Sequence, residues 1–184
     1  MDNPDQALKS KFSYAERLFS EAKYHEAIIQ YKEILIDYPE LVAAINNIGQ
    51  AYEYLNNLEE SIKFYQKSYN LLPGEKIFIN NLANIFYKKK DYKNAIKKID
   101  ESLLINDTQI KIIEIKASCL IILNLGEEAN LFFNKYIKKF PNNIFLNTLH
   151  GKNLINLNQH KLGLEFLKKG TGFIEFNDNK ISII

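Results

Sequence analysis

The sequence contains one cysteine and one arginine, and each scarcity argues against a class of protein. Because Cys119 has no partner, no disulfide framework can form within the chain, which fits a reducing compartment. Arg17 stands among lysines, whereas recognition of phosphates and base edges favours the bidentate guanidinium of arginine. The formal net charge of +2 is too close to neutral to attract nucleic acid or a membrane surface by itself. We therefore expect no nucleic-acid partner.

Long apolar runs are also missing. The longest uninterrupted stretches, such as Cys119 to Leu123, fall far short of the roughly 20 residues that a membrane-spanning helix needs. The first residues, MDNPDQALKSKF, carry acids where a secretory signal has a basic region followed by an apolar run. We expect a cytoplasmic protein without a membrane segment.

Motifs for metal binding and catalysis are absent from the sequence too. Neither HExxH nor CxxC occurs, and the three histidines, His25, His150 and His160, are widely separated. Cys119 lies in an apolar helical pattern with no base nearby in the sequence, so we predict a small buried hydrophobe rather than a nucleophile. The prediction is a protein with no catalytic, cofactor-binding or metal-binding residues, and therefore not an enzyme.

What the sequence does contain is a period of 34 residues. Pro39, Pro73, Asp107 and Pro141 fall at that constant spacing in segments that superimpose on one another. The period divides the chain into a flexible N-terminus (1–7), a repeat region (8–177) and a tail (178–184). The five repeats are 8–41, 42–75, 76–109, 110–143 and 144–177.

Each repeat contains two amphipathic helical patterns, and residues 42–75 show them most clearly. Apolar residues recur at steps of three and four, first over 45–55 and then over 58–69, which places each set on one side of a helix. Asn56 and Asn57 are turn formers, and Asn57 with Glu60 is typical of a helix start. Pro73–Gly74 is typical of a helix end. The unit is a helix-turn-helix hairpin.

Small residues mark the places where helices should meet. The eighth and twentieth positions of all five repeats hold only glycine, alanine or serine, which allows two helix backbones to approach. These residues are Ala15, Gly49, Ala83, Ala117 and Gly151 at position 8, and Ala27, Ser61, Ala95, Ala129 and Gly163 at position 20.

This pattern resembles the tetratricopeptide repeat, whose unit is 34 residues with small residues at positions 8 and 20 and proline near position 32. The resemblance covers about nine tenths of the chain and is loosest in the fifth repeat. It implies an all-α, right-handed solenoid of five antiparallel hairpins. Four residues depart from the family pattern: Lys11 and Asn147 at position 4, where a large apolar residue is usual, and Lys116 and His150 at position 7.

The resemblance also implies a binding surface, because positions 2, 5, 6, 9, 12 and 13 of the first helices face a concave groove in this family. An asparagine carries both a donor and an acceptor, so a row of asparagines can pair with the backbone of an extended peptide. Asn47 and Asn81 match an asparagine ladder known in the family at position 6, where Ile115 and Leu149 stand in the later repeats. The predicted groove residues are Asn46, Asn47, Gln50, Tyr54, Asn80, Asn81, Asn84, Tyr87, Lys111, Ile115, Phe145 and Leu149.

Alternatives to this groove stay open at the level of sequence. The asparagines can form a merely solvated face, or the tail can cover the groove. A clamp for the carboxy-terminal carboxylates of chaperones is disfavoured, because only two of its five residues match and two of its three positive charges are missing. RNA binding by a related repeat is disfavoured by the 34-residue period and by the absence of an arginine-rich face.

Residues 170–184 depart from the repeat, with two glycines followed by several isoleucines and phenylalanines. Since a terminal repeat exposes one apolar face, we predict that this tail folds back over it as an irregular cap. A homodimer contact, or the start of further sequence, are the alternatives.

The sequence thus predicts a scaffold that binds another protein or a peptide. The alternative is a substrate-recruiting or regulatory module of an enzyme complex, or the N-terminal fragment of a longer fusion with an enzyme.

Overall fold

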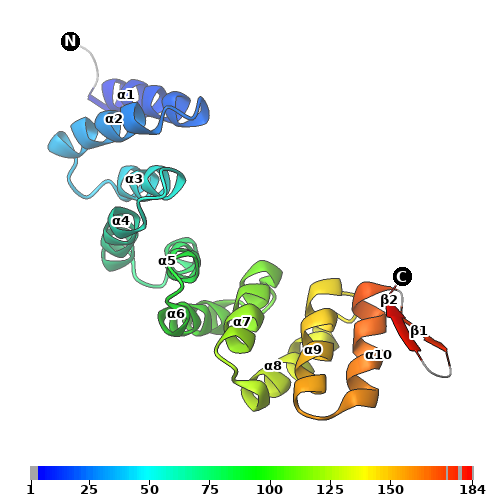
Figure 1. Ribbon diagram of the computed structural model, residues 1–184. Coiled ribbons are helices and arrows are strands. Elements are labelled where there is room, and N and C mark those ends of the chain that lie inside the picture. The colour runs from blue at the N-terminus through cyan, green and yellow to red at the C-terminus, as the bar shows by residue number, and fades with distance from the viewer. Residues whose placement is uncertain (1–3, 173, 178–179, 184) are drawn as a thin grey trace. The chain divides into compact units, whose positions relative to one another are not determined.

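The structure is a computed structural model that describes residues 4–172, 174–177 and 180–183, with side chains for residues 5–172. Ten helices and two short strands occur in the described residues (Figure 1). The helices are α1 Pro4–Ser20, α2 Tyr24–Asp37, α3 Val42–Tyr54, α4 Leu58–Leu71, α5 Lys76–Lys88, α6 Tyr92–Ile105, α7 Ile110–Ile122, α8 Gly126–Lys139, α9 Ile144–Asn156 and α10 His160–Thr171. The strands are β1 Ile174–Asn177 and β2 Lys180–Ile183.

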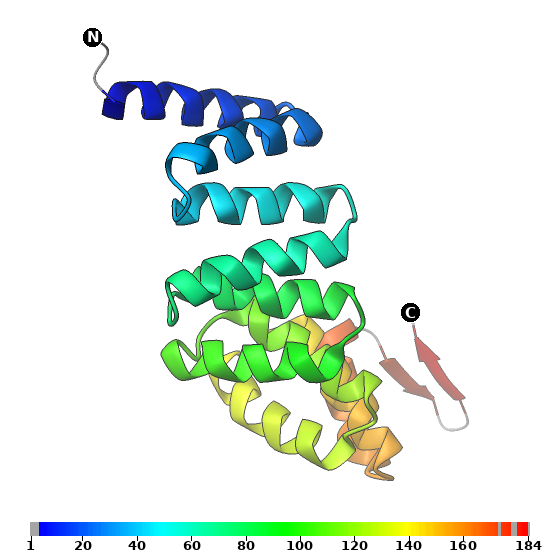
Figure 2. The same cartoon turned by 90° about the vertical axis from the view of Figure 1, so that its left-hand side faces the viewer.

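The chain forms two compact units, and each helical pair corresponds to one predicted repeat. Unit 1, Met1–Ile105, contains α1 to α6, and each of these helices packs against the next in the chain (Figure 2). Unit 2, Asn106–Ile184, contains α7 to α10, in which α9 packs against α7, α8 and α10. The prediction of an all-α solenoid of helical hairpins is confirmed.

All ten small residues of positions 8 and 20 are buried, as expected for places where two helices meet. Two of these residues, both glycines, bring the backbones of α9 and α10 close together. A Cβ atom built on Gly151 would lie 2.7 Å from the carbonyl oxygen of Gly163, and one on Gly163 would lie 2.8 Å from that of Gly151. Since real Cβ atoms do not approach backbone this closely, both positions require glycine.

The turn inside each hairpin has the same backbone geometry in every repeat. The fifteenth residue adopts the left-handed conformation with φ between 56° and 63°, and the next amide returns to a carbonyl in the last turn of the first helix. These residues are Ala22, Asn56, Lys90, Asn124 and Asn158. Asparagine tolerates this conformation, which explains three of the five choices.

Helix ends follow the sequence signals in the second repeat. The side chain of Asn57 accepts a hydrogen bond of 3.2 Å from the backbone amide of Glu60, so the predicted cap at the start of α4 is confirmed. That helix ends at Leu71, and Leu72 alone separates it from Pro73–Gly74.

The N-terminal boundary differs from the prediction. Helix α1 begins at Pro4 rather than at Leu8, so residues 4–7 of the segment predicted to be flexible are helical. Proline is favoured in the first turn of a helix because its missing N–H would have no partner there, and Asp5 complements the helix dipole. Residues 1–3 lie outside the described residues.

The C-terminal boundary differs as well, because the fifth repeat is helical only to Thr171. Gly172, with φ of 83°, ends α10, and residues 174–177 pair antiparallel with residues 180–183. The described part of the tail is thus a strand ribbon instead of the predicted irregular segment. The predicted cap depends on side chains beyond residue 172, which lie outside the described residues.

Candidate functional site

The predicted groove residues of unit 1 lie on α3 and α5, and the structure pairs several of them with one another. Asn46 is 6% exposed, and its side-chain oxygen accepts a hydrogen bond of 2.8 Å from Nδ2 of Asn81 on the next first helix. This bond joins position 5 of one repeat to position 6 of the following repeat. Asn46 therefore positions Asn81 instead of presenting its own amide to a ligand.

Two further asparagines bond to residues of neighbouring helices. Nδ2 of Asn47 donates to the hydroxyl of Tyr31 at 3.0 Å, and Asn80 accepts a hydrogen bond from the hydroxyl of Ser102. Burial raises the pKa of Tyr31, while the bond from Asn47 opposes that shift. The side chains of Asn47 and Asn80 are thus held in fixed orientations.

Glu53, at position 12 of the second repeat, connects three helices and was not among the predicted residues. Its carboxylate accepts hydrogen bonds from the hydroxyl of Tyr65 at 2.6 Å, from Nδ2 of Asn84 at 3.1 Å and from Nζ of Lys88 at 2.6 Å. Burial, followed by the hydrogen bond to this carboxylate, raises the pKa of Tyr65. An acid at a groove position with a lysine one repeat later was the available sequence signal.

Gln50 and Tyr54 remain accessible at the centre and end of this surface. Gln50 is half-buried and makes no side-chain hydrogen bond within the described residues. Tyr54 is 65% exposed, and its ring stacks on that of Tyr24 at 4.9 Å, with the edge of Phe19 against it. Tyr87 is half-buried and lies 5.8 Å from the ring of Tyr92. We call the surface formed by Asn47, Gln50, Tyr54, Asn81 and Asn84 the amide strip.

The predicted groove residues of unit 2 are more apolar. Phe145 is 43% exposed, and together with the half-buried Leu149 it lines a hollow of about 550 Å³. Lys152 and Glu114 also line this hollow, and Glu114 accepts a hydrogen bond of 2.9 Å from Nδ2 of Asn143.

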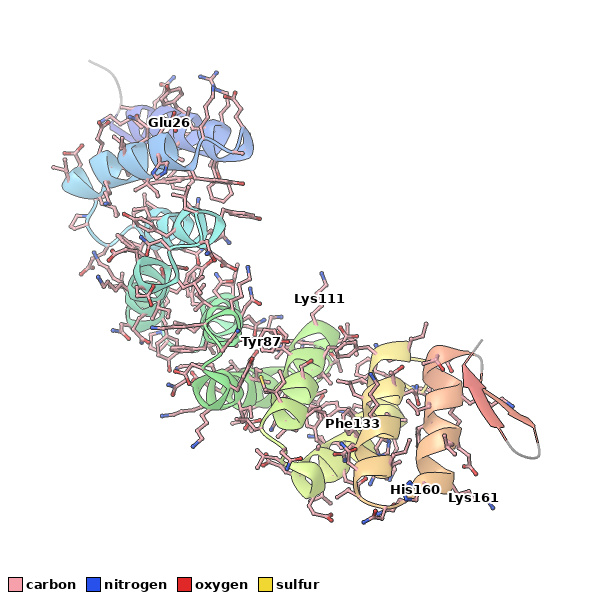
Figure 3. All side chains as sticks on the ribbon, viewed as in Figure 1. Glu26, Tyr87, Lys111, Phe133, His160 and Lys161 are labelled. Carbon is pink, nitrogen blue, oxygen red and sulfur yellow. The ribbon has the colours of Figure 1, made fainter. Side chains whose placement is uncertain are left out.

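Two predicted residues of α7 lie outside the lining of this hollow. Lys111 is exposed, and its side chain extends away from α7 (Figure 3). In the same view, Phe133 of α8 lies between α8 and α9. Ile115 is half-buried. Within unit 2, Phe145 and Leu149 thus line this hollow, whereas Lys111 and Ile115 do not.

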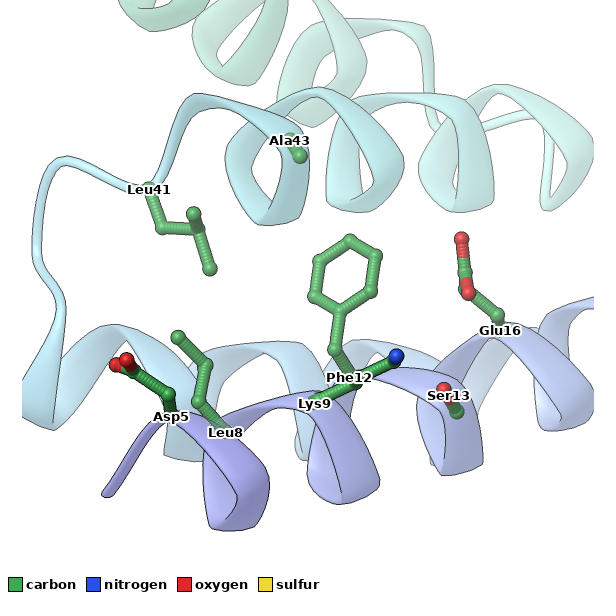
Figure 4. A pocket seen from close by; sticks show the side chains of 8 residues that line it. All are labelled: Asp5, Leu8, Lys9, Phe12, Ser13, Glu16, Leu41 and Ala43. Carbon is green, nitrogen blue, oxygen red and sulfur yellow. The ribbon is translucent and has the colours of Figure 1, made fainter. Parts of the chain in front are cut away.

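A second hollow, of about 400 Å³, lies between α1 and α3 in unit 1 (Figure 4). Its apolar lining comes from Leu8, Phe12, Leu41 and Ala43. Polar and charged side chains complete it: Asp5, Lys9, Ser13 and Glu16. Sequence reasoning missed this hollow, because the distance between α1 and α3 depends on tertiary packing.

Two side chains with possible chemistry, those of Cys119 and His150, are buried. Cys119 is fully buried, and burial raises the pKa of its thiol to about 11. The ring of His150 lies between those of Phe133 and Phe166, and burial lowers its pKa to about 4. No group of three acidic, histidine or cysteine residues lies close enough to hold a metal ion, among the side chains described. None of the described helices is long and apolar enough to cross a bilayer.

Comparison with known proteins identifies the repeat. Residues 42–73 match a family model described as tetratricopeptide repeat. The chain contains a tetratricopeptide repeat at these residues. It is 32% identical over 92 residues to the TPR repeat-containing protein YvcD of Bacillus subtilis (strain 168), which is 48% of this chain and 18% of that protein. The chain therefore spans less than a fifth of the length of this curated relative.

Solved tetratricopeptide-repeat structures share the fold. The MamA 41-end structure from Desulfovibrio magneticus RS-1 superimposes with a TM-score of 0.81 at 16% identity, covering 90% of this chain and 93% of that chain. YrrB, described as a TPR protein with an unusual peptide-binding site, gives a TM-score of 0.77 at 17% identity, covering 88% of this chain and 84% of that chain. At these identities the likeness establishes the fold.

Proposed function

We propose that this protein binds an extended segment of another protein along the amide strip of unit 1 and performs no reaction itself. The observation that supports the proposal most is the state of Gln50 and Tyr54. An accessible amide without a side-chain partner lies on the same helix as a 65% exposed tyrosine. Amides can pair with any peptide backbone, and tyrosine is enriched where proteins bind partners.

The paired asparagines contribute by fixing the surface in advance. Asn46 orients Asn81, and Glu53 orients Asn84. These side chains are therefore already ordered before a ligand binds. Each such bond uses only part of the capacity of an asparagine, which has two donors and an acceptor with two lone pairs. Preorganisation of this kind raises affinity because less conformational entropy is lost on binding.

Exposed Phe145 and half-buried Leu149 in unit 2 would add an apolar contact for a longer partner, with exposed Lys111 and half-buried Ile115 as further predicted contacts. The peptide-binding site that the description of YrrB names lends support, since that protein shares the fold. A module that recruits substrates to an enzyme complex would use the same surfaces and differ in its partner.

Selection of binding peptides from a displayed random library, followed by affinity measurement, tests the proposal. Gln50→Ala and Tyr54→Ala are each expected to lower the affinity for the selected peptides by about fivefold or more, since each removes a contact worth about 1 kcal/mol. Gln30→Ala is the matched control, because Gln30 has the same side chain and burial class but lies on α2. Equal affinities in all three variants would overturn the assignment of this surface.

A further inference from the structure

The hollow between α1 and α3 is lined by the aromatic ring of Phe12 and by charged side chains, of which more are negative than positive. The rings of Phe12 and Tyr31 pack edge-on, with 5.5 Å between their centroids. Leu8 and Leu41 lie on the same side of Phe12 in Figure 4, and all three pack against the core of unit 1. The volume of about 400 Å³ is at the lower end of the range for small-ligand sites, so one or two side chains would fill it.

Carboxylates outnumber positively charged groups among the side chains that line this hollow. Asp5 and Glu16 contribute two negative charges to the lining, and Lys9 contributes one positive charge. Figure 4 shows Asp5 and Glu16 toward opposite ends of the hollow, with Phe12 between them. Glu16 is exposed and forms no hydrogen bond or ion pair within the described part of the chain. The hollow therefore complements a group that is apolar along its length and positive at its tip.

We propose that this hollow binds an arginine side chain from an extended segment of the partner protein. The alkyl stem would lie on Phe12, and the guanidinium would reach the carboxylate of Glu16. Arginine fits better than lysine because its planar head stacks on aromatic rings and pairs with a carboxylate through two parallel hydrogen bonds. This inference rests on the proposed function, since the same partner segment would continue onto the amide strip.

Nuclear magnetic resonance of the full chain tests the inference with two blocked peptides, Ala-Leu-Arg-Leu-Ala and its counterpart with citrulline. Citrulline keeps the length and shape of arginine but carries no charge. The arginine peptide is expected to shift the signals of Leu8, Phe12 and Leu41 and to bind about threefold to fivefold more tightly than the citrulline peptide. This ratio should approach one at high salt, because salt screens exposed charges.

Two substitutions in the hollow should act in opposite directions. Glu16→Gln is expected to lower the affinity of the arginine peptide to that of the citrulline peptide and to leave the citrulline peptide unchanged. Lys9→Gln is expected to strengthen binding of the arginine peptide by about twofold to threefold, because it removes the opposing charge. Glu33→Gln, an exposed glutamate on α2, is the matched control and should change nothing.

Equal binding of the two peptides would overturn the inference and leave only an apolar site. Shifts confined to residues outside the hollow would overturn it as well. Failure here is distinguishable from failure of the proposed function, because Gln50→Ala reports on the amide strip and Glu16→Gln on the hollow. A loss of affinity in the first variant alone supports the strip without the arginine site.

Discussion

At the scale of single residues, the turn position of each hairpin shows a conflict between local preference and repeat geometry. Asn56, Asn124 and Asn158 suit the left-handed conformation, whereas Ala22 and Lys90 adopt it at a steric cost. The cost is outweighed because the backbone amides of Lys90 and Asp91 bond at 2.9 Å to carbonyls of α5 and close the turn. Sequence periodicity located the turn but could not show this conformation at a lysine.

Replacing Lys90 with asparagine should therefore stabilise the protein. We expect Lys90→Asn to raise the free energy of unfolding by about 0.5–1 kcal/mol, since asparagine adopts the left-handed conformation more readily. Urea denaturation followed by circular dichroism measures the change. Lys93→Asn is the matched control: it replaces another exposed lysine, but within helix α6, where asparagine should be neutral or slightly destabilising. A stability gain in the control but not at Lys90 would contradict the argument.

At the scale of elements, the register of small residues predicted which faces of the helices meet, and the structure confirms it. Glycine matters most between α9 and α10, where Gly151 and Gly163 bring the two backbones together. The sequence could indicate a close contact there, because a neighbouring helix backbone can come this close only where a helix has no side chain. The sequence also shows that repeats 1 to 4 keep a Cβ atom at one or both of these positions.

Adding one methyl group at this contact should weaken the fifth hairpin. Gly151→Ala is expected to destabilise the protein by about 1–3 kcal/mol, because the new Cβ atom would overlap the backbone of α10. Thermal denaturation measures the loss. Gly126→Ala, where a Cβ atom would meet side chains alone, the nearest being the end of Leu157 at 3.1 Å, should change stability by less than about 1 kcal/mol. Similar losses in both variants would show that the α9–α10 approach is not the cause.

The tail illustrates a sequence signal that repeat analysis overlooked. In IEFN and KISI, residues 174–177 and 180–183, apolar and polar residues alternate, which is typical of strands. The irregular cap was expected because a terminal repeat exposes one apolar face, and that expectation did not use this alternation. Local pattern was the better guide to the backbone of this segment.

At the scale of the whole molecule, the two compact units differ in how they should respond to acid. His150 belongs to unit 2, where it is 1% exposed and its Nδ1 atom is buried without a hydrogen-bond partner. Its Nε2 atom lies 3.1 Å from the side-chain oxygen of Asn130. Burial lowers the pKa of His150 from 6.5 to about 4, so the folded state keeps the ring neutral where the unfolded state would protonate it.

This pKa shift gives a sign and a range for the effect of pH. The contribution of His150 to stability is complete above pH 6.5, falls as the pH drops through the unfolded pKa, and levels off near the folded pKa of about 4. The total loss is about 3 kcal/mol. Hydrogen exchange should show that amides of residues 106–172 lose protection over this range before those of residues 4–105.

His150→Phe should remove this part of the pH dependence, whereas His160→Asn, at an exposed site, should retain it. Because the phenylalanine variant can repack, direct titration of the His150 ring by nuclear magnetic resonance provides an independent measurement. A titration near pH 6.5 in the folded protein would contradict the argument.

By itself, the sequence determined the repeat period, the helical hairpins and the faces that pack, because these depend on residue spacing along one helix and on side-chain size. It also indicated which helices carry the predicted binding surface. Only the tertiary structure decided which side chains of that surface are accessible: Asn46 is buried against Asn81, Glu53 holds Asn84, and Gln50 and Tyr54 remain accessible. The hollow beside Phe12 was decided at the same level. These features depend on distances between helices of successive repeats, and such distances are set by packing across the repeats rather than by the spacing of residues within one.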